Sequence, residues 1–531
     1  MSLTEIEYDK VNAFSNLLID YNLNKGHFSD LISNFPTLDN LNKQISFKSK
    51  NYNNQFRESL VKEIGNQYKG IKLSEIQKQN INKLLEKNTY TITTGHQLNL
   101  LTGPLYFIYK IISTINLSET LKKNYPEFDF VPIYWMASED HDFDEINNFS
   151  FQGSKFKWAS NQTGVVGEFK LDSIDNVLSE FEKFVSDFPY GNEIIKIFRE
   201  CYLNSNDLSN ATRKLVNILF AKYGLIIIDA NNKNLKSLFR DLIKKELNEK
   251  FIFNKSKKSI KRLNELKYNL QANPREINLF YIHDKKRERI IEKGNLFQTS
   301  NGLKKWNLEE IQDDVNLNPE KFSPNVLFRP IFQEFILPNI CYVGGPAEVA
   351  YWLELKSVFE SLNLTFPLIL NRNSALLLEK KQIDKLNKLN VSIEEIFLPK
   401  KQLKENLVRK YSKLKLDFTN LKQQLNNQFS ELKDKAIHTD KSFIGALNAQ
   451  EQKQINGLKM LEKRLLKSEQ RIHQDKINKV LEIRDKLFPG GKPQERISNF
   501  SEFYKIHGPN MIDKIKNNLV PLNQKFSIIE I

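Results

Sequence analysis

Apolar residues in this chain gather in short, nearly continuous runs that are separated by longer segments with helical spacing. The first run covers Thr89–Gly95, a helical pattern follows over Pro104–Lys123, and a second apolar run covers Phe130–Ser138. A strand, a helix and a strand within about fifty residues predict a βαβ unit with a right-handed crossover. This part of the chain is therefore expected to form a parallel sheet.

The same alternation returns later in the sequence. Gly224–Ala230 is an apolar run after the helical pattern of Asn210–Tyr223, Asn339–Leu362 contains an apolar run, a glycine turn and a helical pattern, and Phe366–Ser374 is a further run. Strands that are apolar throughout are typical of a sheet covered on both faces. The pattern predicts an α/β fold with a parallel sheet at its centre.

Two other regions complete the part of the chain before Lys400. Residues up to about Asn88 have mostly helical spacing, interrupted by a proline-containing loop over Asn34–Thr37. The stretch Lys255–Ser323 is polar and shows no clear period. We expect this stretch to be an irregular lobe inserted into the core.

Between Lys400 and Leu487 the pattern changes to that of a coiled coil. This segment has no proline, and its apolar residues recur in steps of three, four and seven, at Leu407, Tyr411, Leu414, Phe418, Leu421, Leu425, Leu432, Leu458, Leu461, Leu465, Ile472, Ile477, Val480 and Leu487. The period breaks at His438–Ala446 and the segment ends at Pro489–Gly491. We predict two long antiparallel helices in a hairpin arm, with an apolar stripe suited to docking on a second copy.

Composition places the chain among globular proteins. It has 531 residues, 40% hydrophobic residues and two cysteines, and no apolar run is long enough to cross a bilayer. The first residues, MSLTEIEYDKVNAF, lack the apolar core of a signal peptide. Two cysteines cannot form a disulfide framework, so we expect a cytoplasmic location. Cys341 lies within an apolar run and is expected to be a core residue.

The net charge of +15 is unevenly distributed. Lys400–Leu487 contains 21 Lys and Arg against 11 Asp and Glu, and the remainder is nearly balanced. A basic helical arm could bind an RNA backbone, but it has few aromatic residues and its charges are of mixed sign, as on solvated coiled-coil faces. Nucleic acid is therefore an unfavoured partner, and no membrane partner is indicated.

Polar residues follow three of the predicted strands directly. They are Gly95-His96-Gln97 after the first, Glu139-Asp140-His141-Asp142 after the second, and Gly344-Gly345-Pro346-Ala347-Glu348 after a later one. Ligands of open α/β sheets bind beyond the carboxyl ends of the strands. The sequence therefore predicts that these three segments border one crevice.

Each segment also has a purely structural interpretation. Gly344-Gly345 before a helix can cradle a phosphate or carboxylate, or can simply make a tight strand-to-helix turn. His96 and Gln97 can donate to an anion or cap a helix. Capping explains one of the four ionisable residues Glu139–Asp142 but not all four, which favours an acid–base or ligand role for His141 and an amine or metal role for the carboxylates. Their spacing fits no standard zinc site.

Three polar residues lie within apolar segments after residue 325. Arg329 and Gln333 occur in VLFRPIFQEFILP, and Arg372 occurs in LILNRNS. A buried guanidinium needs a partner, so these arginines are expected either to bind an anion or to pair with Glu334 or Glu348.

Four motifs together resemble one known family. TTGHQLNLLTGPLYFIYK, PIYWMASEDHDFDEIN, LFRPIFQEFILPNICYVGGPAEVAYW and PGGKPQERISNF are similar, in this order, to blocks of the bacillithiol biosynthesis cysteine-adding enzymes. The resemblance extends over essentially the whole chain, including the arm. Two residues depart from the family pattern: His96 stands where a glutamine is common, and Cys341 where a small residue is usual.

The resemblance implies a Rossmann-like core similar to nucleotidyl-transferases and class I synthetases. It implies a catalytic core over residues 1–399 with an inserted lobe near 255–323, a coiled-coil arm over 400–487 that pairs two subunits, and a C-terminal segment over 488–531 that returns to the core. It further implies a ligase that joins the carboxylate of L-cysteine to the amine of glucosaminyl-malate, with ATP or another nucleotide activating the carboxylate. The sequence does not indicate whether a metal takes part.

This chemistry assigns expected roles to the residues at the strand ends. Catalytic roles are expected for His141 as base, for Glu139 or Asp140 at the cysteine ammonium, and for Asp142 and His96. Binding of substrate or nucleotide is expected from Gly95, Gln97, Gly103, Pro104, Lys110, Arg329, Gln333, Gly344, Gly345, Glu348 and Arg372. Two other functions remain open: an RNA-binding protein that uses its basic arm, and a dimeric scaffold without catalysis.

Overall fold

The computed structural model describes residues 4–437 and 441–531, and the chain divides into two compact units. The first unit contains the residues up to Asp9, Ala13–Leu377 and Lys492–Ile531. The second contains Lys10–Asn12 and Leu378–Gly491. The expected break at His438–Ala446 lies partly outside the described residues. None of the described helices is both long and apolar enough to span a membrane.

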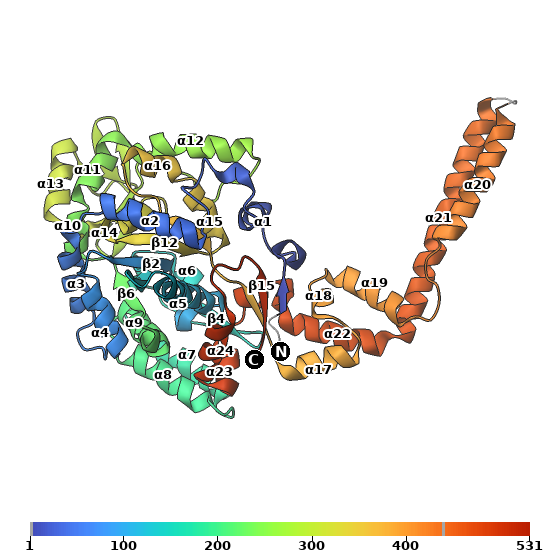
Figure 1. The fold of residues 1–531 in the computed structure, drawn as a ribbon, viewed down its shortest axis with the longest axis horizontal. Helices are drawn as coiled ribbons and strands as arrows, with labels where there is room; N and C mark the ends of the chain where they lie inside the picture. Colours follow the sequence, from blue (N-terminus) through green and yellow to red (C-terminus); the bar gives the residue numbers. More distant parts are fainter. Residues whose placement is uncertain (1–3, 438–440) are drawn as a thin grey trace. The chain divides into compact units, whose positions relative to one another are not determined.

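A five-stranded parallel sheet lies at the centre of the first unit (Figure 1). Its order is β13-β12-β2-β3-β6, formed by Leu368–Asn371, Asn339–Gly344, Thr89–His96, Asp129–Met136 and Ile226–Asp229. All neighbouring strands are parallel, which confirms the predicted α/β core. The chain runs outward from β2 through β3 to β6, and the later strands β12 and β13 lie on the other side of β2. The strand order therefore reverses between β2 and β12, and such a switch point is where Rossmann-like folds bind ligands.

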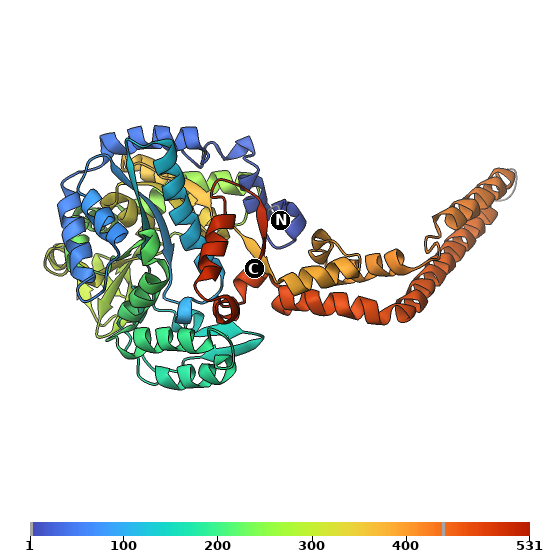
Figure 2. The same ribbon diagram turned by 60° about the horizontal axis from the view of Figure 1, so that its bottom comes forward.

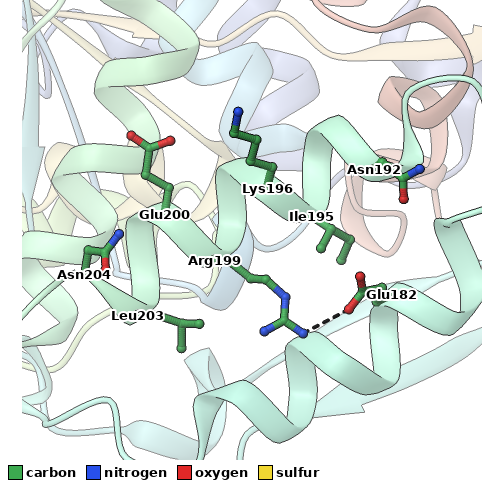
Figure 3. Close-up of a pocket in the computed structure, with 8 residues that line it drawn as sticks. All are labelled: Glu182, Asn192, Ile195, Lys196, Arg199, Glu200, Leu203 and Asn204. Carbon is green, nitrogen blue, oxygen red and sulfur yellow. Dashed lines mark hydrogen bonds and ion pairs between the residues drawn. The ribbon is translucent and has the colours of Figure 1, made fainter.

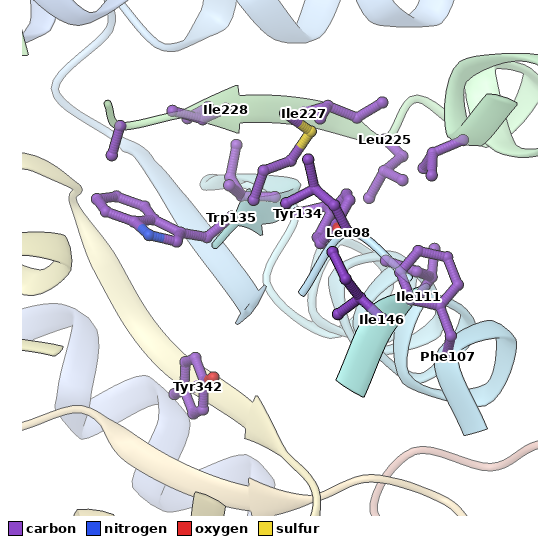
Figure 4. Close-up of a cluster of buried hydrophobic side chains, with 14 of the residues drawn as sticks. Leu98, Phe107, Ile111, Tyr134, Trp135, Ile146, Leu225, Ile227, Ile228 and Tyr342 are labelled. Carbon is purple, nitrogen blue, oxygen red and sulfur yellow. The ribbon is translucent and has the colours of Figure 1, made fainter. Parts of the chain in front are cut away.

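Helices cover both faces of this sheet (Figures 1 and 2). Neighbouring residues of β3 point to opposite faces: Tyr134 packs edge-on against Phe107 of α5 (Tyr106–Asn124), and Trp135 packs edge-on against Phe332 of α14 (Arg329–Ile336). Figure 4 shows Tyr134, Trp135 and Phe107 among the side chains of the buried core, which also includes Tyr342 on another strand. Burial on both faces explains why β2, β3, β6 and β12 are apolar runs in the sequence.

The remaining elements of the first unit surround this core. The predicted N-terminal helices are α1 (Asn16–Asn22), α2 (Leu38–Asn51), α3 (Phe56–Gln67) and α4 (Glu75–Lys83). After β3 come α6 (Phe143–Ile146), the hairpin of β4 (Asn148–Phe151) and β5 (Ser154–Lys157), and the helices α7 (Ile174–Val185), α8 (Gly191–Leu203) and α9 (Leu208–Phe220). The helices α15 (Pro346–Leu353) and α16 (Lys356–Ser361) follow β12, and α23 (Ser501–His507) and α24 (Asn510–Asn518) precede the C-terminal strand. That strand, β15 (Phe526–Glu530), lies between β1 (Thr4–Ile6) and β14 (Ala375–Leu378).

The prediction of an irregular stretch over Lys255–Ser323 is wrong. The helices α10 (Lys233–Leu238), α11 (Arg240–Glu249) and α12 (Phe251–Glu265) precede an antiparallel sheet of order β10-β9-β8-β7-β11, formed by Lys305–Trp306, Leu296–Thr299, Lys286–Lys293, Leu279–His283 and Phe322–Pro324. The helix α13 (Leu308–Leu317) packs on one face of this sheet, where Asp314 accepts hydrogen bonds from Tyr281 and Trp306 at 2.7 and 3.1 Å. Six of the eight residues of β8 are charged, which conceals the strand alternation.

The second unit is helical, as expected, but its first predicted long helix is interrupted. The helices are α17 (Lys380–Lys388), α18 (Ile393–Ile396), α19 (Lys400–Tyr411), α20 (Thr419–Ala436), α21 (Lys441–Ile472) and α22 (Gln474–Leu487). The break after α19 has a local cause, because the side chain of Asp417 accepts from the backbone N–H of Thr419 at 2.8 Å and starts α20. Leu414 is exposed and Leu416 is buried, so this linker alternates instead of continuing the heptad.

Candidate functional site

The switch point between β2 and β12 is occupied by a buried ion pair. Lys110 of α5 reaches the end of β2, where its ammonium group donates to the carbonyl oxygen of Gly95 at 2.5 Å and pairs with the carboxylate of Glu348. Glu348 is the third residue of α15, and it also accepts from the backbone N–H of Gly345 at 2.8 Å and from the hydroxyl of Tyr342. Lys110 thus connects two of the three strand-end segments.

Gly95 is required for the close approach of its neighbours. A Cβ atom there would lie 3.1 Å from the hydroxyl of Tyr342 and 3.3 Å from a guanidinium nitrogen of Arg329. These contacts are tighter than side chains usually make. A glycine at the end of β2 therefore lets a hydroxyl and a cation lie directly against the strand.

Arg329 is the cation of this switch point that lacks a carboxylate partner. Its guanidinium donates to the side-chain oxygen of Gln333 at 3.0 Å and to the hydroxyl of Tyr351 at 2.9 Å, and among the described residues no carboxylate lies within ion-pair distance of it. Burial lowers the pKa of Arg329, but Tyr351, Tyr342 and Glu348 raise it by more than burial lowers it. The net effect is a raised pKa, so the guanidinium remains charged. The expected pairing of Arg329 with Glu334 or Glu348 is wrong for direct contact, and the alternative, anion binding, stays a prediction.

Gln333 and Glu334 instead belong to the buried interior. Glu334 lies 3.7 Å from the ammonium group of Lys48 and accepts hydrogen bonds from Gln333 and Asn339 at 2.9 and 2.7 Å. Burial raises the pKa of Glu334, and the charge of Lys48 opposes this. Gln333 therefore links Arg329 to the core and is not itself exposed to a ligand.

Arg372 is also committed to a partner, but to one that was not expected. Its guanidinium makes a two-pronged contact with Glu495 at 3.0 and 2.9 Å, and both side chains are buried. Its backbone N–H donates to the carbonyl of Gly344 at 2.8 Å. The prediction that Arg372 pairs with Glu334 or Glu348 is wrong, because the C-terminal segment supplies the carboxylate. Through its backbone N–H, Arg372 thus fixes the position of Gly344, the last residue of β12.

His96 lies between aromatic rings at the end of β2. The centroids of Tyr106 and Phe107 are 5.4 and 5.2 Å from its own ring centroid. Burial, followed by the charges of Lys110 and Arg372, holds the pKa of His96 well below its usual value. Its Nε2 atom is buried and has no hydrogen-bond partner among the described residues. The imidazole is thus neutral, with one nitrogen unused.

The carboxylates after β3 are organised by Gln97. The side-chain amide of Gln97 donates to Asp140 at 2.7 Å and to Glu145 at 2.8 Å, and Asp140 accepts from the backbone N–H of His141 at 2.8 Å. Asp142 caps α6 by accepting from the N–H of Glu145 at 3.3 Å. The carboxylates of Asp140 and Glu145 are therefore held side by side by hydrogen bonds from the same Gln97 amide. Asp142 has a structural role as the cap of α6.

Glu139 points to a different partner from its neighbour Asp140. Its carboxylate pairs with the buried ammonium of Lys236, which also donates to the side chain of Asn231 at 3.1 Å and to the carbonyl of Glu320 at 2.9 Å. Nearby, Ser138 donates to Asp229 at the end of β6. Glu139 is therefore neutralised within the protein, so Asp140 is the better placed of the two to meet a substrate cation.

His141 is held by the inserted lobe. Arg287 of β8 donates to the Nδ1 atom of His141 at 3.0 Å, to the hydroxyl of Ser323 at 2.9 Å and to the carbonyl of Pro324 at 2.9 Å, and its guanidinium lies 4.0 Å from the ring centroid of Phe280. Burial and then the charge of Arg287 lower the pKa of His141. With Nδ1 accepting, the proton of the neutral ring sits on Nε2.

Gly103 and Pro104 shape the chain between β2 and α5. Leu101, Thr102 and Gly103 have φ values of 48°, 70° and 64°, and a Cβ atom on Gly103 would lie 2.7 Å from the side chain of Asn99. The side chain of Asn499 donates to the carbonyls of Leu101 and Gly103 at 2.9 and 2.6 Å. This turn joins the end of β2 to the start of α5.

The three strand-end segments are thus brought together. Gln97 joins the first to the second, and Lys110 joins the first to the third. Sequence analysis missed several residues that complete the arrangement, namely Glu145, Lys236, Arg287, Tyr342, Tyr351 and Glu495. Tyr342 and Glu145 could have been predicted, because Tyr342 comes shortly before the Gly-Gly turn and Glu145 lies in the acidic run. Nothing near Arg287 or Glu495 in the sequence points to this site.

A separate open depression lies on the helices α7 and α8 (Figure 3). It has a volume of about 550 Å³ and is lined by Glu182, Asn192, Ile195, Lys196, Arg199, Glu200, Leu203 and Asn204. Arg199 crosses it to pair with Glu182 at 2.9 Å and also pairs with Asp175. None of the predicted site residues lines this depression. Elsewhere in the described chain, no three His, Cys, Asp or Glu side chains gather as metal ligands do.

Two family models together match nearly the whole chain. The model described as bacillithiol biosynthesis BshC, N-terminal Rossmann-like domain, matches residues 1–373. The model described as bacillithiol biosynthesis BshC, C-terminal coiled-coil domain, matches residues 375–531. Both agree with the fold of the described residues.

Relatives of similar length carry one shared name. A protein of Flavobacterium johnsoniae named "Putative cysteine ligase BshC" is 46% identical over 526 residues, which is 99% of both chains. Proteins of the same name from Christiangramia forsetii and Bacillus cytotoxicus are 46% identical over 529 residues and 26% identical over 498 residues. The first of these alignments covers 99% of this chain and 98% of the relative, and the second covers 90% and 91%.

Proposed function

The chain belongs to the BshC family of bacillithiol biosynthesis, and we propose that it is a ligase that joins the carboxylate of L-cysteine to the amine of glucosaminyl-malate. The observation that carries this proposal is the switch point, where Arg329 has no carboxylate partner among the described residues and lies beside the Lys110–Glu348 pair. A group of cations at this position suits a phosphate-bearing substrate. The carboxylates of Asp140 and Glu145, which Gln97 holds just after β2, suit an amine.

Forming an amide from a free carboxylate requires a better leaving group than hydroxide. We propose that a nucleoside triphosphate such as ATP supplies it: a carboxylate oxygen of cysteine bonds to the α-phosphorus, and pyrophosphate leaves. The amine of glucosaminyl-malate then bonds to the acyl carbon, loses a proton, and the nucleoside monophosphate leaves. The protein must therefore bind phosphates, orient an ammonium group and accept one proton.

The phosphate contacts are assigned to side chains. The backbone N–H of Gly345 already donates to Glu348, and Pro346 has no N–H, so Gly344-Gly345 offers fewer donors than the sequence suggests. The guanidinium of Arg329 lies at the end of β2 and has N–H groups available to donate to a phosphate. The positive charge of Lys110 lies next to it. Guanidinium and ammonium groups in a partly buried site stabilise developing phosphate charge strongly.

The amine contacts are assigned to the carboxylates on Gln97. Asp140 has no lysine or arginine within ion-pair distance among the described residues, and Glu145 is exposed beside it. We assign Glu145 to the ammonium group of cysteine and Asp140 to the proton that the attacking amine loses. His141 was expected to be the base, but its Nδ1 atom accepts from Arg287, so it is better suited to donate through Nε2.

The direct test is product formation by the purified protein. The protein is incubated with cysteine and glucosaminyl-malate, with and without ATP, and the amide is detected by mass spectrometry. We expect the amide only when ATP is present. Arg329→Gln and Asp140→Asn should each lower kcat/KM by about 100-fold, because each removes a group that acts in the transition state.

A control comes from the depression on α7 and α8. Arg199→Gln removes an arginine that, unlike Arg329, is paired with carboxylates and lies outside the candidate site, and it should leave kcat/KM unchanged. No amide with any nucleoside triphosphate would remove the proposed function. Full activity of folded Arg329→Gln protein would remove the proposed phosphate site.

We also propose that the helical arm pairs two copies of the chain. Several large apolar side chains on its helices are exposed in the single chain, namely Leu421, Leu432, Leu461 and Ile472. Exposed apolar rows on long helices commonly pack against a second helix pair. Sedimentation should give a dimer for the wild type and a monomer for the double variant Leu461→Glu, Ile472→Glu, and a wild-type monomer at all concentrations would contradict this pairing.

A further inference from the structure

The open face of the lobe sheet lies beside the carboxylates that follow β3. Successive residues of a strand point to opposite faces of its sheet. In the lobe, Tyr281, Ile290 and Trp306 are buried on the face that α13 covers. The other face carries Phe280, Ile282, Arg287, Arg289 and Ile291, because Phe280 pairs with Arg289 and Ile282 pairs with Arg287 across β7 and β8.

This open face continues directly from the candidate site. The ring centroids of Phe280 and His141 are 5.6 Å apart, and Arg287 donates to His141. Arg289 follows Arg287 by two residues on the same face of the sheet, and it is close enough for its charge to act on His141. A ligand that reaches His141 therefore meets this sheet face next.

The two arginines differ in what they have left to offer. Arg287 already donates to three partners and lies over Phe280. The side chain of Arg289 is exposed and makes no hydrogen bond or ion pair with any residue that the structure describes. Its neighbours Phe280, Ile282 and Ile291 are half-buried apolar side chains. Arg289 is thus a free, planar cation above an apolar floor.

We propose that Arg289 binds a carboxylate of the amine-bearing substrate and so makes the protein select an anionic acceptor. This inference rests on the proposed function and adds the part of the protein that recognises the malate group. A guanidinium can hold a carboxylate with two parallel hydrogen bonds, and the apolar floor suits the carbon chain between the carboxylates. The amine would then extend toward Asp140 and His141. Arg287 acts differently, as a positioning residue that orients His141.

The alternative explanation is that Arg289 only attracts the acidic segment Glu139–Asp142 and so steadies the lobe. The two explanations differ in which substrate responds to a variant. A steadying role affects all substrates of the site alike. Carboxylate recognition affects the anionic acceptor and spares an acceptor that lacks the malate group.

The test compares two acceptors and three variants. Kinetics are measured with glucosaminyl-malate and with methyl glucosaminide, which has the same amine and no carboxylate. Arg289→Gln should raise the KM for glucosaminyl-malate by about 10-fold or more, because it removes a charged hydrogen-bond donor. The KM values for cysteine and ATP, and kcat/KM for methyl glucosaminide, should stay within about 2-fold. Arg289→Lys should restore part of the loss, since it keeps the charge without the planar pair of donors.

Lys286→Gln is the matched control, because it removes an exposed cation from the same strand on the opposite face of the sheet. It should change neither acceptor. Binding of glucosaminyl-malate alone, measured by titration calorimetry, should be weakened by Arg289→Gln to the same degree as KM is raised.

Equal effects on both acceptors, or unchanged binding of glucosaminyl-malate in Arg289→Gln, would overturn the assignment while the ligase function stands. A wild-type protein that neither binds glucosaminyl-malate nor forms the amide would instead overturn the proposed function itself. Because the side chain of Arg289 is exposed and has no hydrogen-bond or ion-pair partner among the described residues, its variants are expected to fold, and thermal melting checks this.

Discussion

The parallel core sheet and the antiparallel lobe sheet both deliver polar side chains to the candidate site, but by different rules. In the core, five strands end at one edge, and the chain places Gly95, His96 and Gln97 there simply by leaving a buried strand. In the lobe, Arg287 reaches His141 from near the start of β8, on the open face of the sheet. The core therefore supplies groups through strand ends, and the lobe supplies them through one side of a half-covered sheet.

This difference determines how strongly each region resists substitution. At the core edge, the buried Lys110 is paired with the half-buried Glu348, so that changing one leaves a charge without its partner. The lobe groups are half-buried or exposed, and their loss leaves the remaining sheet intact. We therefore expect core substitutions to affect folding and activity together, and lobe substitutions to affect activity alone.

The largest effect is expected for Lys110→Met. It leaves the half-buried Glu348 carboxylate with the Tyr342 hydroxyl and one backbone N–H as its hydrogen-bond donors among the described residues. The free energy of unfolding, measured with urea, should fall by about 3–5 kcal/mol, and ligase activity should be lost. The double variant Lys110→Met, Glu348→Gln should recover part of the stability but none of the activity. Additive losses in this cycle would show that the two residues do not act as a pair.

An intermediate effect is expected for Arg287→Ala. Removing this cation should raise the pKa of His141, which burial and Arg287 now lower, and should free its Nδ1 atom. We expect kcat to fall by about 10-fold with stability nearly unchanged, as for loss of a group that orients an acid or base. NMR titration of the His141 ring, assigned with His141→Gln, measures the pKa change. An unchanged His141 titration would show that Arg287 does not control this ring.

The smallest effect is expected for Glu246 of α11, which contacts the chain where it enters the lobe sheet. Glu246 accepts from the backbone and side chain of Asn278, just before β7, and burial raises its pKa to about 7 from 4.5. Because the native protein keeps this proton when the unfolded chain has lost it, the contribution of Glu246 to stability falls as the pH rises from about 4.5 to about 7. Glu246→Gln should flatten the decline in stability over this range by about 1–3 kcal/mol.

Melting temperatures between pH 5 and pH 7.5 measure this change, and a parallel wild-type and variant curve would contradict it. Glu354 offers a second case, because it accepts from the N–H groups of Gln271 and Ala272 and burial raises its pKa to about 7 as well. Glu354→Gln should flatten the same part of the curve.

The core and its strand-end residues were predictable because their signal is local. A strand buried on both faces must be apolar, and the first polar residues after it must lie at the sheet edge, so TYTITTGHQ and IYWMASEDH each predict both a strand and a site. The strand order and the pairing of Lys110 with Glu348 were not local. They depend on which strands become neighbours, and 237 residues of sequence separate these two side chains.

The lobe was not predictable for a physical reason. Both faces of β8 carry charged residues, so KRERIIEK has no long apolar run and shows only a weak alternation of buried and exposed positions. The partner of Arg372 could not be predicted because Glu495 is distant in sequence. It belongs to the segment that returns to the core after the arm. Between α19 and α20 the sequence predicted a helix where the structure has none. The heptad pattern of apolar residues continues through residues that form a turn.

The central claim, that the ends of β2, β3 and β12 form one ligase site, is tested most directly by a crystal structure with a non-hydrolysable ATP analogue and cysteine. We predict phosphate oxygens within hydrogen-bonding distance of Arg329 at the switch point between β2 and β12, and the cysteine ammonium group against the carboxylates held by Gln97. A nucleotide bound elsewhere, such as the depression on α7 and α8 or the helical arm, with the strand ends free of ligand, would contradict the account.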